Sequence, residues 1–470
     1  MIARRVVFAC VLVALPASLL AETPPLAAAA RARDLSAIRT LLQQGAPVNG
    51  AQGDGATALH WAAHWDDGEA AALLLGAGAR PDAANDLGVT PLSLACLNAS
   101  VPMVRRLLDA GADPNAPAQV PPLVTCARTG NTAAVQALLD RRADVRAREP
   151  NRDQTALMAA VAEGHVEAVR ALLAAGADVR ARSRVTRAFV NRANPNDVLA
   201  AVVGEVSRDG STPLLFAARQ GDARVGALLL DAGADVNDIT PDGTSALTMA
   251  VHGNHTALAR LLLERGANPN IIGSGYTALH AAVLRGNAEL VAALLASGAN
   301  INSRIRNGTA TTRGSREYFL PDSLVGATPL MLAAKFLEPG ILRALLAKGA
   351  DPTLPLRDGT TLLMAAAGVG SQPQLFDRRD RIAVLRGSEE KAAAEVVQLL
   401  LTGPVDVNAV NAAGDTALHG AAKLNYPAVV RQLLARGATV DARNRKGETP
   451  LAVASGDEAR QALRTAGARE

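Results

Sequence analysis

Aromatic side chains are scarce in this chain of 470 residues: they make up 2% of it, although 49% of the residues are hydrophobic. Large globular cores depend on bulky aromatic side chains for much of their buried area. Alanine and leucine supply most of the apolar surface here. The length alone would suggest about three domains, but this composition favours small, repeated helical units over three separate globules.

Clustered positive charge is also absent. The net charge is +4, with no run of lysine or arginine and no ladder of aromatic residues beside basic ones. Nucleic acid is therefore not an expected partner. Cysteine is rare as well, and three cysteines, one of them Cys10 near the N-terminus, are too few for a disulfide scaffold.

The N-terminus has the pattern of a secretory signal peptide. A positive segment, Met1–Arg5, precedes an apolar stretch, Val6–Leu15, and small residues lead to a cleavage position after Ala21. An uncleaved anchor is the alternative, but Pro16 interrupts the stretch before it reaches the ~20 residues that a spanning helix needs. We expect a signal peptide over residues 1–21, no stable membrane insertion after cleavage, and a bacterial protein that is periplasmic or secreted.

A short motif, threonine followed by Ala-Leu or Pro-Leu, recurs along the rest of the chain. Clear copies begin at Thr57, Thr90, Thr155, Thr212, Thr277, Thr328, Thr416 and Thr449, and weaker ones at Pro24, Pro121, Ser245 and Thr361. Two small residues follow most copies, then a turn containing glycine, a stretch with paired leucines, and a segment such as "GADVN". Threonine caps a helix, proline suits a first helical turn, and glycine ends the second helix.

This pattern resembles the ankyrin repeat family, whose signature is T-P-L-H-x-A with a period of about 33 residues. The resemblance covers residues 24 to 470 and implies an all-α solenoid over residues 22–470. About twelve helix-turn-helix units, the last one truncated, would be joined by β-hairpin fingers and share one continuous core. Repeat four departs from the pattern, because Arg142 stands where its siblings have glycine. A residue other than glycine costs about 1 kcal/mol at positive φ, so we expect a soft joint near residues 116–150.

Three loop insertions lengthen the regular spacing, near Ser183–Arg208, Ser303–Val325 and Ser371–Ala393. The first two fall in fingers, and the third falls between the two helices of one repeat. They contain Phe189, Tyr318, Phe319 and Phe376, which we expect either to pin the loops to the solenoid or to anchor a partner. Long loops inside compact domains are often functional.

The resemblance also implies a binding face, because ankyrin proteins bind through a concave surface formed by the fingers and two variable positions that end each first helix. Six of the eleven pairs at these positions carry arginine or lysine, and Glu163 alone is acidic. A partner with an acidic surface is one hypothesis, and chance bias is the other. The predicted partner-binding residues are His64, Trp65, Arg128, Arg219, Arg285, Lys335, Phe336 and Lys423.

His60 and His64 are spaced four residues apart, as in a helical metal site. His60, His280 and His419, however, occupy the histidine position of the signature, which is structural in the family. Only His64 and His252 fall on variable positions. Two imidazoles leave a zinc site short of ligands, and no glutamate follows His60. We therefore expect no metal here. Asp235–Gly243 is acidic but lacks the calcium loop's final glutamate, so it is better explained as a finger.

Cys96 and Cys126 lie on the first helices of adjacent repeats. We expect buried free thiols, because they occupy different helical positions and a disulfide needs Cα atoms within about 7 Å. An oxidising compartment leaves a disulfide possible.

No signature of nucleophilic, phosphate-binding or dinucleotide-binding chemistry occurs in the sequence. We therefore expect a monomeric, non-catalytic protein-binding scaffold without a cofactor. A small-molecule or ion sensor, or an enzyme whose site is formed by the insertions, remain the alternatives.

Overall fold

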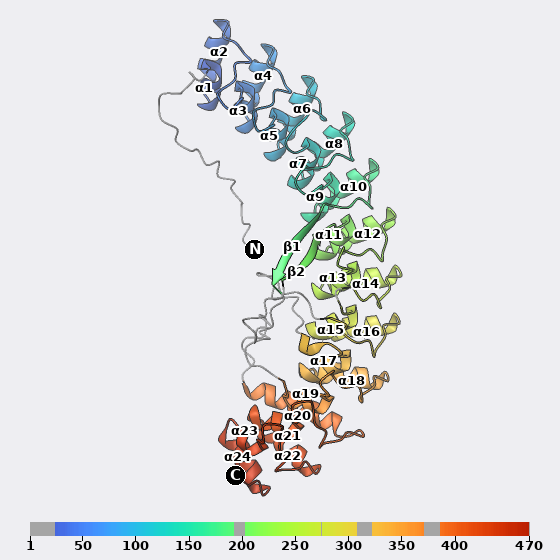
Figure 1. The fold of residues 1–470 in the computed structure, drawn as a ribbon. Coiled ribbons are helices and arrows are strands. Elements are labelled where there is room, and N and C mark those ends of the chain that lie inside the picture. Colours follow the sequence, from blue (N-terminus) through green and yellow to red (C-terminus); the bar gives the residue numbers. More distant parts are fainter. Residues whose placement is uncertain (1–23, 192–202, 274, 308–321, 371–385, 470) are drawn as a thin grey trace. The chain divides into compact units, whose positions relative to one another are not determined.

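The computed structural model describes residues 24–191, 203–273, 275–307, 322–370 and 386–469. The predicted signal peptide lies outside them. The chain separates into two compact units, a first unit over Met1–Asp178 and a second unit over Val179–Glu470. Each unit is built from helix pairs that follow one another in chain order (Figure 1).

Twenty-four α-helices form twelve pairs in the described part of the chain, as the repeat count predicts. The first unit contains α1 (Pro25–Arg31) and α2 (Leu35–Gln43), α3 (Ala58–His64) and α4 (Gly68–Gly76), α5 (Pro91–Leu97) and α6 (Val101–Asp109), α7 (Pro122–Thr129) and α8 (Thr132–Asp140), and α9 (Ala156–Ala162) and α10 (Val166–Ala174). The second unit contains α11 (Pro213–Gln220) and α12 (Ala223–Asp231), α13 (Ala246–His252) and α14 (Thr256–Glu264), α15 (Ala278–Arg285) and α16 (Ala288–Ala296), α17 (Pro329–Lys335) and α18 (Pro339–Ala347), α19 (Leu362–Ala366) and α20 (Arg386–Leu400), α21 (Ala417–Lys423) and α22 (Pro427–Ala435), and α23 (Pro450–Val453) and α24 (Asp457–Thr465).

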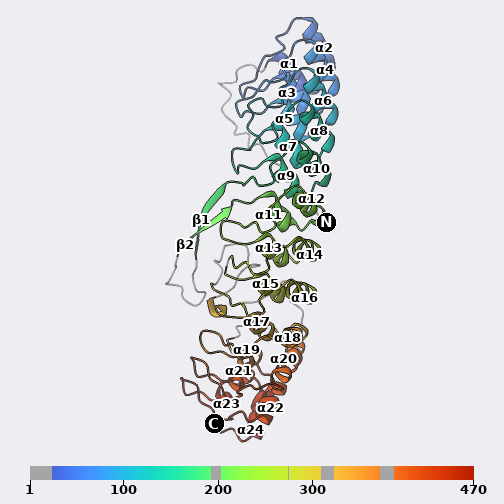
Figure 2. The same ribbon diagram turned by 90° about the vertical axis from the view of Figure 1, so that its right-hand side faces the viewer.

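Within each unit, first helices pack on first helices and second helices on second helices, so two layers share one core (Figure 2). The paired alanines of the motif, such as Ala62 and Ala63 in α3, are buried. Their small side chains let adjacent first helices approach closely. The leucines of the second helices, such as Leu74 in α4, fill the space between the layers.

The signature histidines join neighbouring repeats. The backbone N–H of Thr57 donates to Nδ1 of His60 at 3.1 Å, which leaves the proton on Nε2. Nε2 then donates to the carbonyl of Val89 in the next repeat at 3.0 Å. His280 and His419 repeat this arrangement with Ala327 and Glu448. The structural role predicted for these histidines is confirmed.

A second series of inter-repeat bonds, the finger ladder, runs along the start of the fingers. The Asn49 side chain accepts from the N–H of Arg80 at 2.8 Å and donates to the carbonyl of Gly78 at 3.1 Å. Asn115, Asn270 and Asn408 make the same pair of bonds with their own next repeats. One side-chain amide thus ties each of these fingers to the next one.

In the described residues, each of the three insertions contains some regular structure. The first forms an antiparallel hairpin of β1 (Val185–Asn191) and β2 (Val203–Asp209). The third ends as extra turns of α20, which has 15 residues where most second helices have 9. In the second, Ile305 and Leu324 are buried at its two ends, and Leu324 closes a short 3-10 helix, η2 (Asp322–Leu324).

Cys96 in α5 and Cys126 in α7 form a disulfide, with Cα atoms 4.6 Å apart. The expectation of free thiols is therefore wrong. The two cysteines do stand one position apart in their helices, but α5 packs directly on α7. Both side chains turn into the same narrow space between helices that small residues keep close, and both are fully buried.

Several turns in the described chain use a side chain at positive φ where the motif has glycine, including those at Arg33, Ala99, Asn254, Leu337 and Asn425 after first helices. Arg142, after α8, has φ of 63°, and Asp66, after α3, has φ of 53°. Both lie in the left-handed region, where a side chain is strained. The condition on which the predicted soft joint depends, a positive φ at Arg142, is therefore met.

Candidate functional site

An aromatic cluster marks the end of α3 in the first unit. The indoles of Trp61 and Trp65 stack with centroids 6.5 Å apart, and the His64 ring lies edge-on to both, at 5.7 and 4.6 Å. Two guanidinium groups from the preceding repeat face the indoles, Arg31 at 5.3 Å from Trp61 and Arg33 at 6.0 Å from Trp65. Guanidinium groups are attracted to the negative face of an aromatic ring.

The helix places these rings on one side. Positions 61, 64 and 65 are three and four residues apart, which is one face of a helix. Trp61 is half-buried, and its indole N–H donates to the side chain of Gln52 at 3.1 Å. Trp65 is 41% exposed, which is unusual for an indole in a folded chain.

The neighbouring first helix extends this surface with an apolar side chain. Leu97, the last residue of α5, is 63% exposed. The side chain of Asn98 donates to the carbonyls of Ala63 at 3.0 Å and His64 at 2.8 Å, so the ends of α3 and α5 are held side by side. At the end of α7, the exposed Arg128 continues the row, and its carbonyl accepts from Nε2 of His165 at 3.1 Å. In the first unit the surface therefore has an apolar centre between arginines.

In the second unit, the predicted basic residues also lie at the ends of first helices. Arg219 is exposed and its guanidinium lies 5.6 Å from the Phe216 ring. Arg285 is partly buried and donates to the carbonyl of His252. Lys335 donates to the carbonyl of Gly370 at 3.3 Å, and burial lowers its pKa although Asp358 opposes the shift. Lys423, at the end of α21, is exposed.

Some of the variable positions do not face solvent. His252 is 5% exposed and its Nδ1 lies 3.2 Å from the Tyr276 hydroxyl, so it belongs to the core rather than to a binding surface. Phe336 caps α17 and is only partly exposed. Tyr318, Phe319 and Phe376 lie outside the described residues. Phe189 pairs with Glu205 in the hairpin through its backbone.

Two features of the site were missed in the sequence. Arg33 was not assigned to the binding face, because it follows α1 in the turn and reaches Trp65 only across the repeat interface. Leu97 stands at one of the eleven variable pairs but is not among the predicted partner-binding residues, and the structure leaves it 63% exposed. The position of each at the end of a first helix was the available signal.

The described residues also limit which other kinds of site they can form. Among those residues, no group of three or more histidine, cysteine or acidic side chains is arranged to hold a metal ion. No helix in that part of the chain is both long and apolar enough to cross a membrane.

Models of protein families match most of the sequence. "Ankyrin repeats (3 copies)" matches residues 26–118, 92–183, 185–273, 214–305 and 383–468, and "Ankyrin repeat" matches residues 325–355. The chain belongs to the ankyrin repeat family. Ankyrin repeats are generally scaffolds for protein–protein interaction, and proteins of the family are typically not enzymes.

Several known proteins are similar over part of this ankyrin repeat chain. Neurogenic locus notch homolog protein 1 from Xenopus tropicalis is 33% identical over 141 residues, which cover 27% of this chain and 6% of that protein. Ankyrin repeat and LEM domain-containing protein 1 homolog from Caenorhabditis elegans is 47% identical over 70 residues, 15% of this chain and 10% of that protein. The chain thus spans only a small part of both relatives.

Among solved structures, the crystal structure of human ASB11 ankyrin repeat domain is 28% identical. It covers 52% of this chain and 99% of that chain, with a TM-score of 0.42.

Proposed function

We propose that this ankyrin repeat protein is a non-catalytic scaffold that binds a partner protein through the recognition strip. The strip is the row of side chains at the ends of the first helices, with the fingers beside it. The observation that carries the proposal is the exposed indole of Trp65, held by Trp61 and His64 between arginines. Rigid, exposed tryptophans are typical anchors of protein interfaces.

The charges of the strip support a partner with an acidic surface. Arg31, Arg128, Arg219 and Lys423 are exposed at the ends of first helices, and Glu163 is the acidic exception. Complementary charge speeds the encounter of two proteins and orients them. The partner we propose combines acidic side chains with an apolar group that contacts Trp65 and Leu97.

Site-specific photocrosslinking tests this function. A photoreactive phenylalanine analogue at Leu97, on the strip, is compared with the same analogue at Arg105, exposed on the second helix α6. In extract of the source cells we expect one discrete protein adduct from position 97 and none from position 105, and Trp65→Ala should remove it. An adduct that is equal at both positions, or that persists in Trp65→Ala, would refute the proposal.

We also infer that the protein is exported. The N-terminal pattern of residues 1–21 supports this, and so does the Cys96–Cys126 disulfide, because disulfides persist in oxidising compartments. Sequencing of the mature N-terminus tests the inference. A chain that begins just after Ala21 and is recovered outside the cytoplasm is the expected result, and an intact Met1 in the cytoplasm would overturn it.

A further inference from the structure

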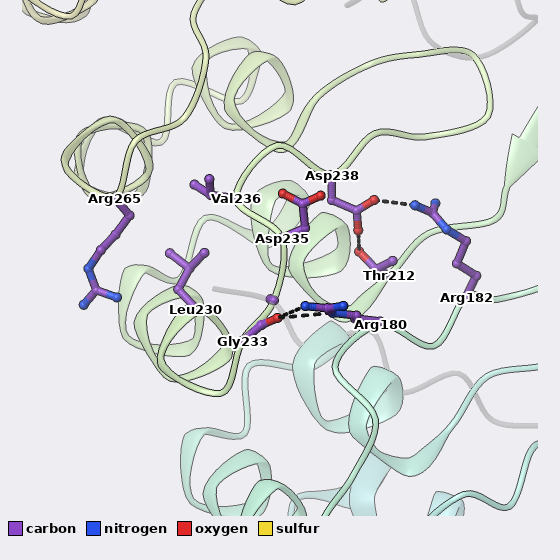
Figure 3. Close-up of a pocket in the computed structure, with 10 residues that line it drawn as sticks. Arg180, Arg182, Thr212, Leu230, Gly233, Asp235, Val236, Asp238 and Arg265 are labelled. Carbon is purple, nitrogen blue, oxygen red and sulfur yellow. Dashed lines mark hydrogen bonds and ion pairs between the residues drawn. The ribbon is translucent and has the colours of Figure 1, made fainter.

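A pocket of about 570 Å³ opens in the second unit beside the end of α12 (Figure 3). Its volume lies within the range of about 300–1,000 Å³ typical of small-molecule sites. The lining residues are Arg180, Arg182, Thr212, Leu230, Gly233, Ala234, Asp235, Val236, Asp238 and Arg265. Among the three arginines of the lining, Arg182 pairs with Asp238 and Arg265 pairs with Asp231 of α12. None of the lining residues lies at the C-terminal end of a first helix, so the pocket is separate from the row of side chains that contains Trp65 and Leu97.

At the pocket, an arginine stands in place of the asparagine that makes the finger-ladder bonds in other repeats. Arg180 occupies the position of Asn49 and Asn237 in the repeat, with "ADVR" in place of "ADVN". Nε and Nη2 of Arg180 both donate to the carbonyl of Gly233 at 3.4 Å, so Arg180 takes over the donor role of the asparagine amide. Figure 3 shows its guanidinium group beside Gly233.

Arginine cannot take over the other role. An asparagine also accepts, through Oδ1, from the N–H two residues after that glycine, whereas a guanidinium group has no acceptor. Here that N–H belongs to Asp235, which lines the pocket. In the part of the chain that the structure describes, no acceptor is assigned to it. The pocket therefore presents a backbone donor next to a guanidinium group.

The walls of the pocket are fixed by their own bonds. Arg182 pairs with Asp238 and donates to the carbonyls of Gly210 at 3.0 Å and Ile239 at 2.9 Å. The Thr212 hydroxyl donates to the same Asp238 carboxylate, whose charge is thereby matched. Asp235 Oδ1 accepts from the N–H of Asn237 at 2.9 Å, so the Asp235 carboxylate is held by the backbone of its own finger. Leu230, Ala234 and Val236 supply apolar surface.

We propose that this pocket binds a carboxylate that carries a short apolar group. One carboxylate oxygen accepts from the N–H of Asp235, the other faces the Arg180 guanidinium, and the apolar group lies against Leu230 and Val236. Charged hydrogen bonds of this kind are stronger than neutral ones. The carboxylate belongs either to a free small molecule or to the C-terminus of a peptide, since both present the same group.

Comparison with the other repeats suggests a substitution that tests the role of Arg180 specifically. Arg180→Asn restores the regular ladder, because the new amide can accept from Asp235 N–H and donate to the Gly233 carbonyl. The acceptor role of the ligand is then filled by the protein itself. Arg146→Asn is the matched control, since Arg146 has the same ladder position one repeat earlier, in the first unit, and lines no part of this pocket.

The experiment measures binding by calorimetry on the full mature chain. The probes are N-acetyl-leucine, its uncharged amide, and a short peptide ending in leucine with a free or amidated C-terminus. We expect the acid to bind at least about tenfold more tightly than the amide. Arg180→Asn should lose at least about tenfold in affinity with an equal or higher melting temperature, and Arg146→Asn should keep wild-type affinity. Tighter binding of the free-ended peptide than of N-acetyl-leucine would assign the carboxylate to a chain terminus. Equal affinity for the two probes would assign the carboxylate to a small molecule.

Three results would overturn the proposal: equal binding of acid and amide, unchanged binding by a folded Arg180→Asn, or no saturation of the wild type by any probe up to about 10 mM, a concentration at which even weak sites fill. None of these results would affect the proposed function, because the crosslinking position Leu97 and its control Arg105 both lie in the first unit, outside this pocket.

Discussion

The Trp65 indole stacks on that of Trp61 with an angle of 25° between the ring planes, while a hydrogen bond to Gln52 fixes Trp61 itself. One tryptophan thus positions the other. The two side chains should therefore respond differently to the same substitution.

Trp65→Ala should weaken partner binding by at least about thirtyfold, since a central interface tryptophan contributes about 2 kcal/mol or more. It should change the melting temperature little because Trp65 is exposed. Trp61→Ala removes a half-buried ring and its hydrogen bond, so it should lower the melting temperature as well. Calorimetric melting and binding to the crosslinked partner check both variants. If Trp65→Ala unfolds the chain, Trp65 belongs to the core and the register of the strip is wrong.

Charge reversal of Arg128 and Arg219 to glutamate should slow association with the partner at low salt and leave dissociation nearly unchanged. Both side chains are exposed, so they act mainly by steering, which salt screens over about 10 Å at 0.1 M. Stopped-flow association rates at two ionic strengths measure the effect. Arg105→Glu on α6 is the control, and an equal slowing by that variant would assign the effect to net charge alone.

The disulfide should be detectable chemically and in stability. Alkylation of the denatured, unreduced protein should leave Cys96 and Cys126 unmodified, and alkylation after reduction should label both. Replacing both with alanine should lower the free energy of unfolding by about 4 kcal/mol, the loop-closure effect of a cross-link between residues 30 apart. Reduction of the double variant should change nothing further. Full labelling without a reductant would show that the bond does not form.

Arg142→Gly should raise the free energy of unfolding by about 0.5–1 kcal/mol, because glycine adopts positive φ without strain. The converse control is Gly111→Ala at the same turn one repeat earlier. There φ is 91° and an added Cβ meets no atom within 4 Å, so only the backbone cost is measured. Hydrogen exchange of the wild type should be faster over residues 116–150 than in adjacent repeats, and Arg142→Gly should slow it. Uniform protection would contradict the soft joint.

Stability should fall as the pH drops from about 6.5 to about 4, because burial lowers the pKa of His280 from 6.5 to about 4. The unfolded chain binds a proton in this window and the native chain does not, so acid favours unfolding. The slope approaches about 1.4 kcal/mol per pH unit for one proton. Burial also lowers the pKa of His60, which acts in the same direction. Denaturant unfolding between pH 7 and 4 measures the slope, and His280→Gln should reduce it. An identical slope in that variant would show that His280 does not cause the loss.

Much of the fold could be predicted because the residues that define each repeat act over short distances along the chain. The cap at Thr57, the alanines Ala62 and Ala63, and the glycine after most second helices act within a few residues of their own helices. The candidate site was harder to predict from the sequence than the fold. His64 and Trp65 were found through their position in the repeat, but the cation–π contact of Arg33 with Trp65 and the burial of His252 depend on side chains from neighbouring repeats.

The disulfide shows the same limit. Counting helical positions predicted that Cys96 and Cys126 stay apart, but the spacing of α5 and α7 brings their Cα atoms to 4.6 Å. Spacing between helices is set by packing of several side chains at once, and counting along one helix does not include it.

By itself, the sequence determined the architecture of this protein, its twelve helix pairs and its structural histidines, because hydrophobic period and capping act locally. Only the tertiary structure decided which side chains meet across repeats. The stacked pair of Trp61 and Trp65 under two arginines, the joined cysteines, and the ladder position where Arg180 opens a pocket all lie at interfaces between repeats. At such interfaces, contact depends on close packing between segments about thirty residues apart.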